Sequence, residues 1–122
     1  MRPMRDHRKL KAFELADALV VSIYESTRAF PREELFGLTS QMRRAAVSVV
    51  GNIVEGSARD GEAEYLHFLS MAFGSLREVG YYIGLAARLG YLATDVAREL
   101  NGRYDETARV LSRLIQSLRR AS

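Results

Sequence analysis

The chain has 122 residues, a mass of 13.7 kDa and a formal net charge of +3. That length suits one domain with a core of its own and is too short for two. The sequence holds no cysteine and two histidines, which excludes a disulfide framework, a thiolate zinc site and a cysteine nucleophile. With 48% hydrophobic and 27% charged residues and no long uncharged apolar run, the chain is predicted to be globular, cytoplasmic and away from membranes. We expect a single domain over residues 1–122 with a basic N-terminal extension, residues 1–11.

The first helix is predicted over about residues 12–28. Apolar residues recur there at i, i+3, i+4 and i+7, the spacing of an amphipathic helix. The helix should stop before Pro31, because the residue preceding a proline avoids the helical region. Residues 31–34 then have the composition of the first turn of a short helix, with proline leading and acids following, and Gly37 should end it.

A second long helix is predicted over residues 40–55. Thr39 is the expected N-cap, since its hydroxyl can accept a bond from a free backbone N–H of the first turn. Gly56 is the expected residue just past the end of the helix, where a left-handed conformation favours glycine. The polar, glycine-containing stretch 56–61 should be a loop.

Two longer helices complete the predicted chain. The third runs over residues 62–89 and is closed by Gly90, and the fourth is capped by Thr94 or Asp95. No segment alternates with the period of two that a strand requires. The predicted fold is therefore all-α, an antiparallel up-down-up-down four-helix bundle with short connections.

The second and third helices carry more apolar surface than one bundle can cover. At about 100° per residue each has a core stripe and a second apolar side. The core stripes are Met42, Ala46, Val49, Val50 and Ile53 on one helix and Tyr65, Phe68, Leu69, Ala72, Leu76, Val79 and Ile83 on the other. The second sides are Val47 and Val54, and Met71, Tyr82, Leu85 and Leu89. We therefore expect a homo-oligomer.

A polar strip lies between these two helices. In an antiparallel hairpin turning near Gly61, Arg44 would face Glu78, Ser48 would face Ser75 and Glu55 would face His67. The full set of the predicted network is Arg44, Ser48, Asn52, Glu55, His67, Ser75 and Glu78. It is interpreted as a structural network fixing the helix register, with a ligand pocket or plain solvation as alternatives. A buried Arg44 pair predicts that Arg44→Ala destabilises the fold by a few kcal/mol.

Catalytic and metal chemistry have little support in the residues. Glu64 and His67 form one E-x-x-H spacing, which di-iron bundles use twice together with two further core glutamates. No phosphate-binding glycine motif occurs, and Gly74, Gly80 and Gly84 are interpreted as sites of close helix approach. We expect no enzyme activity, no cofactor and no metal.

Charge is distributed unevenly along the chain. Residues 1–11 and 109–122 each sum to +4, and the middle sums to −5. The predicted topology brings both basic blocks and Arg59 to one end, and places Glu33, Glu34, Asp95 and Glu99 at the other. A basic end suits phosphate backbones, with solvated, frayed termini as the alternative. The candidate nucleic-acid-binding residues are Arg2, Arg5, Arg8, Lys9, Lys11, Arg59, Arg113, Arg119 and Arg120.

Two long ordered motifs follow Ile23-Tyr24 and Phe30-Pro31. Residues 36–56 read FGLTSQMRRAAVSVVGNIVEG and residues 68–78 read FLSMAFGSLRE. Over about residues 10–118 the chain resembles the bacterial four helix bundle protein family, also called the 23S rRNA intervening-sequence protein or S23 family. The family pattern Asn-Ile-Ala-Glu-Gly differs here only in Val54.

The resemblance implies an antiparallel bundle that assembles as a homopentamer. Family members are encoded in insertions within 23S rRNA genes or elsewhere in bacterial genomes, and their role is generally unknown. A similar group, the accessory variability proteins of diversity-generating retroelements, are basic pentamers that bind nucleic acid and a reverse transcriptase. The leading hypothesis is a non-enzymatic oligomer that binds RNA or DNA, with a reverse transcriptase as a further partner if retroelement-associated. The alternative is a structural or protein-interaction scaffold without nucleic acid.

Overall fold

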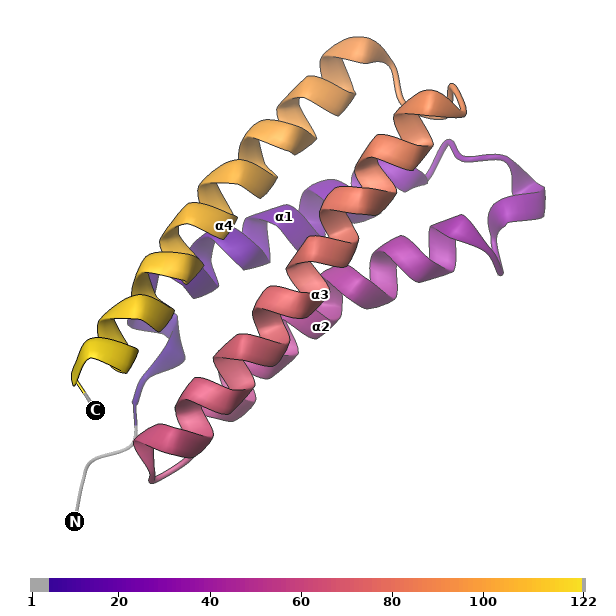
Figure 1. Ribbon diagram of the computed structural model, residues 1–122. Helices are drawn as coiled ribbons and strands as arrows, with labels where there is room; N and C mark the ends of the chain where they lie inside the picture. Colours follow the sequence, from indigo (N-terminus) through magenta and orange to yellow (C-terminus); the bar gives the residue numbers. More distant parts are fainter. Residues whose placement is uncertain (1–4, 122) are drawn as a thin grey trace.

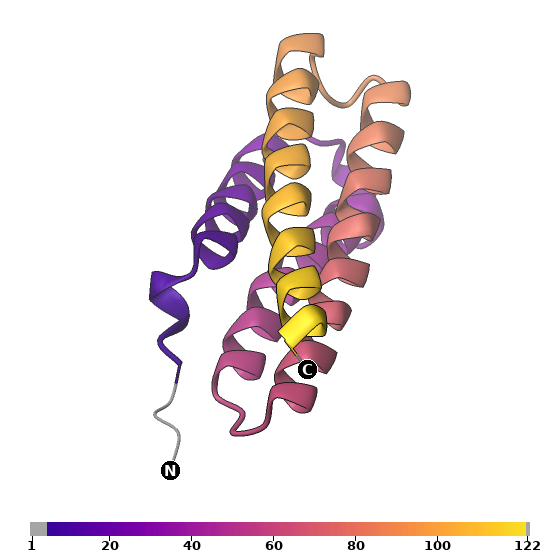
Figure 2. The same cartoon turned by 60° about the vertical axis from the view of Figure 1, so that its left-hand side comes forward.

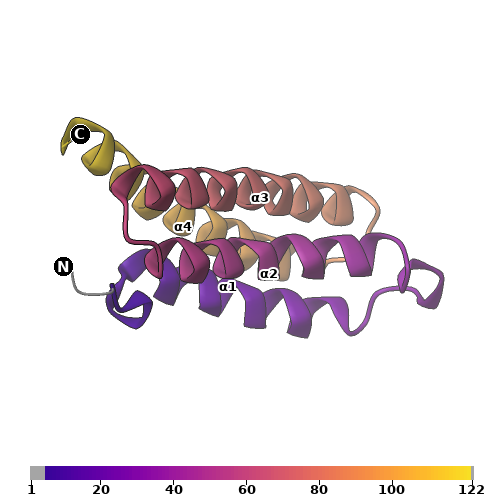
Figure 3. The same ribbon diagram turned by 90° about the horizontal axis from the view of Figure 1, so that it is seen from below.

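The computed structural model describes residues 5–121 and forms one antiparallel bundle of four long helices (Figure 1). Their bounds are α1 Lys11–Thr27, α2 Leu38–Ser57, α3 Glu62–Arg88 and α4 Thr94–Ala121, with short 3-10 helices at η1 His7–Lys9 and η2 Arg32–Glu34. Each helix packs against its neighbours in sequence, and α4 returns to α1 (Figure 3). The predicted all-α bundle is confirmed. Within the described residues, no helix is long and apolar enough to span a membrane.

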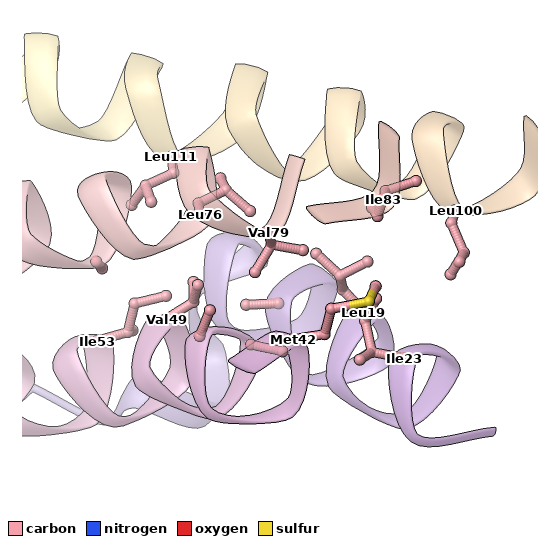
Figure 4. Packing of buried hydrophobic residues seen from close by; sticks show 14 of the residues in the cluster. Leu19, Ile23, Met42, Val49, Ile53, Leu76, Val79, Ile83, Leu100 and Leu111 are labelled. Carbon is pink, nitrogen blue, oxygen red and sulfur yellow. The ribbon is translucent and has the colours of Figure 1, made fainter. Parts of the chain in front are cut away.

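The core is a single layer of aliphatic side chains shared by all four helices (Figure 4). Leu19, Met42, Leu76 and Leu111, one from each helix, are each at most 1% exposed. The two predicted core stripes are confirmed apart from Val50, which is half-buried at the margin of the core, and Phe68, which is half-buried outside it. Burial of each such aliphatic side chain contributes roughly 1.5–3 kcal/mol, so this layer is the main source of stability.

The start of α2 differs from its prediction. Gly37, not Thr39, occupies the N-cap position, and the helix begins at Leu38. The first-turn N–H of Leu38 is satisfied by the carboxylate of Glu34, whose Oε1 accepts it at 3.1 Å. Thr39 is instead buried, 4% exposed. The cap is therefore supplied by a glutamate of the preceding turn, which a search for a hydroxyl directly before the helix misses.

Gly56 lies inside α2, and the prediction that it ends the helix is wrong. The helix continues to Ser57, and a Cβ built on Gly56 would stand 2.8 Å from Cβ of Phe68 on α3. Gly80 plays the same part between α3 and α4, where a Cβ would meet the Tyr104 ring at 2.6 Å. Close approach is thus confirmed for Gly80. A Cβ built on Gly74 or Gly84 has nothing within 4 Å. The interpretation of these two glycines as sites of close helix approach is therefore wrong within one chain.

The prediction that Gly90 closes the third helix is confirmed at the turn between α3 and α4. Gly90 has φ 76°, and its N–H and that of Tyr91 bond to the carbonyls of Ala87 and Ala86 at 3.1 and 2.9 Å. Such a pair of bonds with a left-handed glycine is the usual helix C-terminal motif. Helix α4 begins at Thr94, so Thr94 and Asp95 lie in its first turn rather than capping it.

Candidate nucleic-acid interface

The two ends of the bundle differ in what they contain. Residues 5–10, the α2–α3 turn at residues 58–61 and the last turns of α4 lie together and are called the terminal end (Figures 1 and 2). Residues 28–37 and 89–93 connect helices at the opposite end, called the loop end. The predicted gathering of the basic segments at one end is confirmed for the described residues. Arg2 lies outside them.

Arg5 fastens the N-terminal segment to the α2–α3 hairpin. One guanidinium nitrogen donates to the carbonyl oxygen of Arg59 at 2.8 Å, and the group lies over the Tyr65 ring at 4.1 Å from its centroid. A second nitrogen is 3.8 Å from Glu62 Oε1. With its side chain 19% exposed, Arg5 is largely withdrawn from any nucleic acid.

Other cations of the terminal end are also engaged within the chain. Arg59 pairs with Glu55 one helical turn before it, lies 4.0 Å from Glu64, and stacks over Phe68. Lys11 is 3.9 Å from Glu14. These acids offset much of the positive charge that the sequence places at this end.

Arg8 and Asp6 form a closed local pair. The Arg8 guanidinium donates to both carboxylate oxygens of Asp6, at 2.9 and 3.0 Å, and the backbone N–H of Arg8 donates as well. The side-chain hydrogen bond from Arg8, followed by the backbone bond, lowers the pKa of Asp6 to about 2. Arg8 is thus paired within the chain while its side chain stays 76% exposed, and Lys9 beside it is also exposed.

Among residues 5–121, a different set of arginines, on α4, has no side-chain hydrogen bond or ion pair. Arg109, Arg113 and Arg120 are exposed, and at about 100° per residue they fall within roughly 40° of one another around the helix. The sequence from 109 to 120 contains no acidic and no aromatic residue. We call these three side chains the α4 arginine strip. Arg113 and Arg120 are among the predicted nucleic-acid-binding residues. Arg109 is not, because it entered that prediction only through the net charge of residues 109–122.

The polar network between α2 and α3 is smaller than predicted. Ser48 and Ser75 are joined Oγ to Oγ at 2.8 Å, and Asn52 Nδ2 donates to the carbonyl and hydroxyl oxygens of Ser48 at 2.9 and 3.2 Å. These bonds confirm the expected facing of Ser48 and Ser75. The half-buried trio fixes the register of the hairpin.

The other two expected pairs of that network do not form. Arg44 and Glu78 are both exposed, and no ion pair joins them in the part of the chain that the structure describes. At about 100° per residue, Arg44 is rotated by about 40° from Ser48 around the axis of α2. Because Arg44 is exposed and Ser48 is half-buried, this rotation turns Arg44 away from α3. The large loss expected for Arg44→Ala is therefore wrong for the single chain, and about 0.5 kcal/mol or less is now expected.

Glu55 and His67 also have other surroundings than predicted. Glu55 is paired with Arg59, and exposed His67 lies edge-on to Phe68 with ring centroids 5.9 Å apart. Glu64, the other half of the E-x-x-H spacing, is exposed. Over residues 5–121 no cluster of three or more histidine, aspartate or glutamate side chains forms that could hold a metal ion.

Half of the outer apolar side chains that the sequence predicts to be uncovered are exposed in one chain, and Val54 is among those that are half-buried. Val47, Met71 and Leu89 are 47%, 38% and 49% exposed, while Tyr82 and Leu85 are half-buried. Phe36, at the loop end, is exposed at 94% and was not singled out from the sequence. A phenylalanine in a helix-rich motif is taken for core by default, and no local signal marks it as projecting.

Comparison with known proteins identifies the family. The family model described as 23S rRNA-intervening sequence protein matches residues 8–113. The chain belongs to this family. Arg5, Arg119 and Arg120 of this family member fall outside the matched span. No curated protein matches the chain.

A solved structure supports the fold of this family member. It is a protein with unknown function from the S23 ribosomal protein family of Bacteroides thetaiotaomicron VPI-5482. The superposition has a TM-score of 0.76 at 20% sequence identity and covers 85% of this chain and 97% of the other. At that identity the likeness establishes the bundle architecture and nothing about activity.

Proposed function

We propose that this protein is a self-associating helical bundle that binds the phosphate backbone of RNA or DNA through the α4 arginine strip. The observation that carries the proposal is the strip itself: three exposed arginines on one helix face, with no acid between positions 109 and 120. Guanidinium groups suit phosphate oxygens because they donate in a fixed, planar fork. Lys9 and Arg119 would extend the contact toward the terminal end.

Binding of this kind depends on salt and not on base sequence. Each phosphate neutralised releases condensed counterions, so affinity falls steeply as salt rises. The strip contains no aromatic residue on which bases could stack, which argues against recognition of unpaired bases. Self-association, for which the uncovered Val47, Met71 and Leu89 are the support, would repeat the strip on every copy. The family resemblance makes five copies the expected number, and a reverse transcriptase is a further partner if the gene is associated with a retroelement.

A second candidate function is a structural or protein-interaction scaffold that binds no nucleic acid. The pairing of Arg5, Arg8 and Arg59 with in-chain carboxylates favours it, because those cations serve the fold. In both proposals the chain has no catalytic role.

Titration of labelled RNA and DNA at two salt concentrations separates the two. The test variant is Arg109→Gln, Arg113→Gln and Arg120→Gln combined. Its matched control removes three exposed arginines elsewhere, by Arg77→Gln, Arg88→Gln and Arg98→Gln. The two variants carry the same net charge and differ only in where it was removed.

The proposal predicts that the test variant loses about tenfold or more in affinity and that its salt slope falls by about 2–3 per chain. The control variant should bind nearly as well as the unmodified protein. Absence of binding at low salt, or equal losses for the two variants, would overturn the nucleic-acid proposal and leave the scaffold.

A further inference from the structure

Two residue pairs of the sequence have the composition that lets the main chain close on a side chain. Asp60-Gly61 is its one Asp-Gly pair and Asn101-Gly102 its one Asn-Gly pair. In such a pair the backbone nitrogen of the glycine can attack the side-chain carbonyl carbon of the residue before it and form a five-membered ring. Glycine permits this because it has no Cβ to hinder the approach or restrict the backbone. The reaction is intramolecular, so its rate depends on whether the fold lets the two atoms meet.

The Asn-Gly pair lies where the fold prevents this reaction. Asn101 and Gly102 are in the interior of α4. Each backbone N–H of an α-helix donates to the carbonyl four residues earlier, and the backbone dihedrals are fixed. Ring closure at Asn101 would therefore require α4 to open, although both residues are exposed to water.

The Asp-Gly pair lies in the turn between α2 and α3, and both of its residues are exposed (Figure 1). Backbone bonds hold this turn as far as Arg59, whose N–H donates to the carbonyl of Gly56 at 3.1 Å. Among residues 5–121, the N–H groups of Asp60 and Gly61 donate to no oxygen. The Asp60 carboxylate does not cap α3, and it has no hydrogen bond or ion pair in the same part of the chain. Neither reacting group is thus held in another interaction.

We propose that Asp60 is a site of spontaneous isoaspartate formation in the folded protein. The nitrogen of Gly61 forms a bond to Cγ of Asp60. One carboxylate oxygen leaves as water, taking the N–H hydrogen and a proton from solvent, and a cyclic imide remains. Water then opens the ring. Attack at Cγ restores aspartate, whereas attack at the main-chain carbonyl carbon of Asp60 gives isoaspartate. The second step returns the water and the proton of the first, so the composition is unchanged and no electrons are transferred.

The new linkage falls between two contacts that hold the turn. The carbonyl of Arg59 accepts from Arg5 at 2.8 Å, and the carbonyl of Gly61 accepts from the N–H of Tyr65 at 3.1 Å. Isoaspartate inserts the Cβ of residue 60 into the main chain between these two carbonyls. We therefore expect the isomerised turn to hold the N-terminal segment less firmly.

Peptide mapping of protein kept in native buffer tests the proposal. Samples are taken over several weeks at neutral pH and physiological temperature and are then digested. Isoaspartate leaves the peptide mass unchanged but blocks an endoproteinase that cleaves before aspartate, whereas deamidation of Asn101 raises the mass. The expected result is isoaspartate at residue 60 and an intact Asn101. Absence of isoaspartate at residue 60, or a change at Asn101 that is as fast, would overturn the proposal.

The same experiment in guanidinium chloride tests the part that the fold plays. Once α4 is unfolded, Asn101 should react faster than Asp60, because an amide nitrogen leaves more readily than a carboxylate oxygen. The order of the two sites should therefore reverse on unfolding. The same order in both states would show that the fold does not select Asp60.

Gly61→Ala is the matched variant. The added Cβ meets nothing within 4 Å, and the φ of −88° at Gly61 suits alanine, so the fold should be kept. We expect isoaspartate to form several-fold more slowly in this variant, and an equal rate would contradict ring closure by Gly61. Stored unmodified protein should melt at a lower temperature than fresh protein, and stored Gly61→Ala should not. Unchanged melting of isomerised protein would overturn the expected loosening of the N-terminal segment.

Discussion

The two ends of this bundle use their side chains in opposite ways. At the terminal end most cations have a carboxylate, a carbonyl oxygen or an aromatic ring within the same chain, as Arg5 and Arg59 do. At the loop end, by contrast, the apolar side chains of Leu35 and Phe36 are exposed at 50% and 94%. The cations of the terminal end are engaged by their own chain, with Arg5 Nη2 and Arg59 Nε buried and lacking a hydrogen bond among the described residues, whereas two adjacent large apolar side chains are exposed at the loop end. A net charge summed along the sequence therefore overstates what the terminal end offers a partner.

The largest expected effect comes from filling the close approach at Gly56. Alanine normally stabilises a helix interior relative to glycine by about 1 kcal/mol. At Gly56 its Cβ would meet Cβ of Phe68 at 2.8 Å, so α2 and α3 must separate. We expect Gly56→Ala to lower the free energy of unfolding by about 1–3 kcal/mol in a urea titration, as overpacking does.

The matched control for that variant is Gly74→Ala on α3. Nothing lies within 4 Å of the Cβ it adds, so stability should rise by about 0.5–1 kcal/mol. If both substitutions stabilise the protein, the helices near the α2–α3 turn are not as close as described.

A smaller effect on stability is expected at Arg5. Comparing its substitution with that of Lys9 distinguishes a cation that holds the fold from one that is exposed. Arg5→Ala removes the bond to the Arg59 carbonyl and the contact with the Tyr65 ring. We expect a loss of about 1–2 kcal/mol in thermal or urea unfolding. Lys9→Ala, at an exposed neighbouring position, should change stability by less than about 0.5 kcal/mol. Equal, negligible effects would place Arg5 among the free cations and restore it as a nucleic-acid contact.

The smallest effect concerns the hydrogen bond from the Tyr91 hydroxyl to the Glu34 carboxylate at the loop end. Hydrogen bonding to the Glu34 carboxylate, and then burial, raises the pKa of Tyr91 above its ordinary value of 10.0. Because the raised value belongs to the folded state, the stabilisation is complete below pH 10 and is lost as pH rises through the raised pKa. A tyrosinate absorbance titration of the protein minus that of Tyr91→Phe should therefore yield a pKa above 10. A difference curve centred at or below that value would show that the bond is absent.

The spacing of apolar residues, together with the positions of proline and glycine, was enough to predict the four helices, the core around Leu76 and the turn at Gly90. The facing of Ser48 and Ser75 was also predictable, because an antiparallel hairpin with a known turn sets the register of both helices. Gly56 was misread because a glycine near a helix end serves equally as a terminator or as a contact site. Only the distance to Phe68 distinguishes the two.

The candidate site was harder to predict than the fold. Sequence distance says nothing of the carboxylate that an arginine meets from another helix, so Arg5 and Glu62 were not recognised as neighbours. Arg44 and Glu78 matched in register but not in direction, since a side chain's angle around the helix decides whether it reaches its partner. Phe36 has no pattern that distinguishes it from a core residue, and its exposure follows from the turn that Glu34 locks.

One chain leaves Val47, Met71 and Leu89 exposed, and we propose that the protein acts as several copies. The most direct measurement is its mass in solution, by light scattering after size-exclusion chromatography at micromolar concentration. We expect a mass several times the 13.7 kDa of the chain. A single species of 13.7 kDa would contradict it.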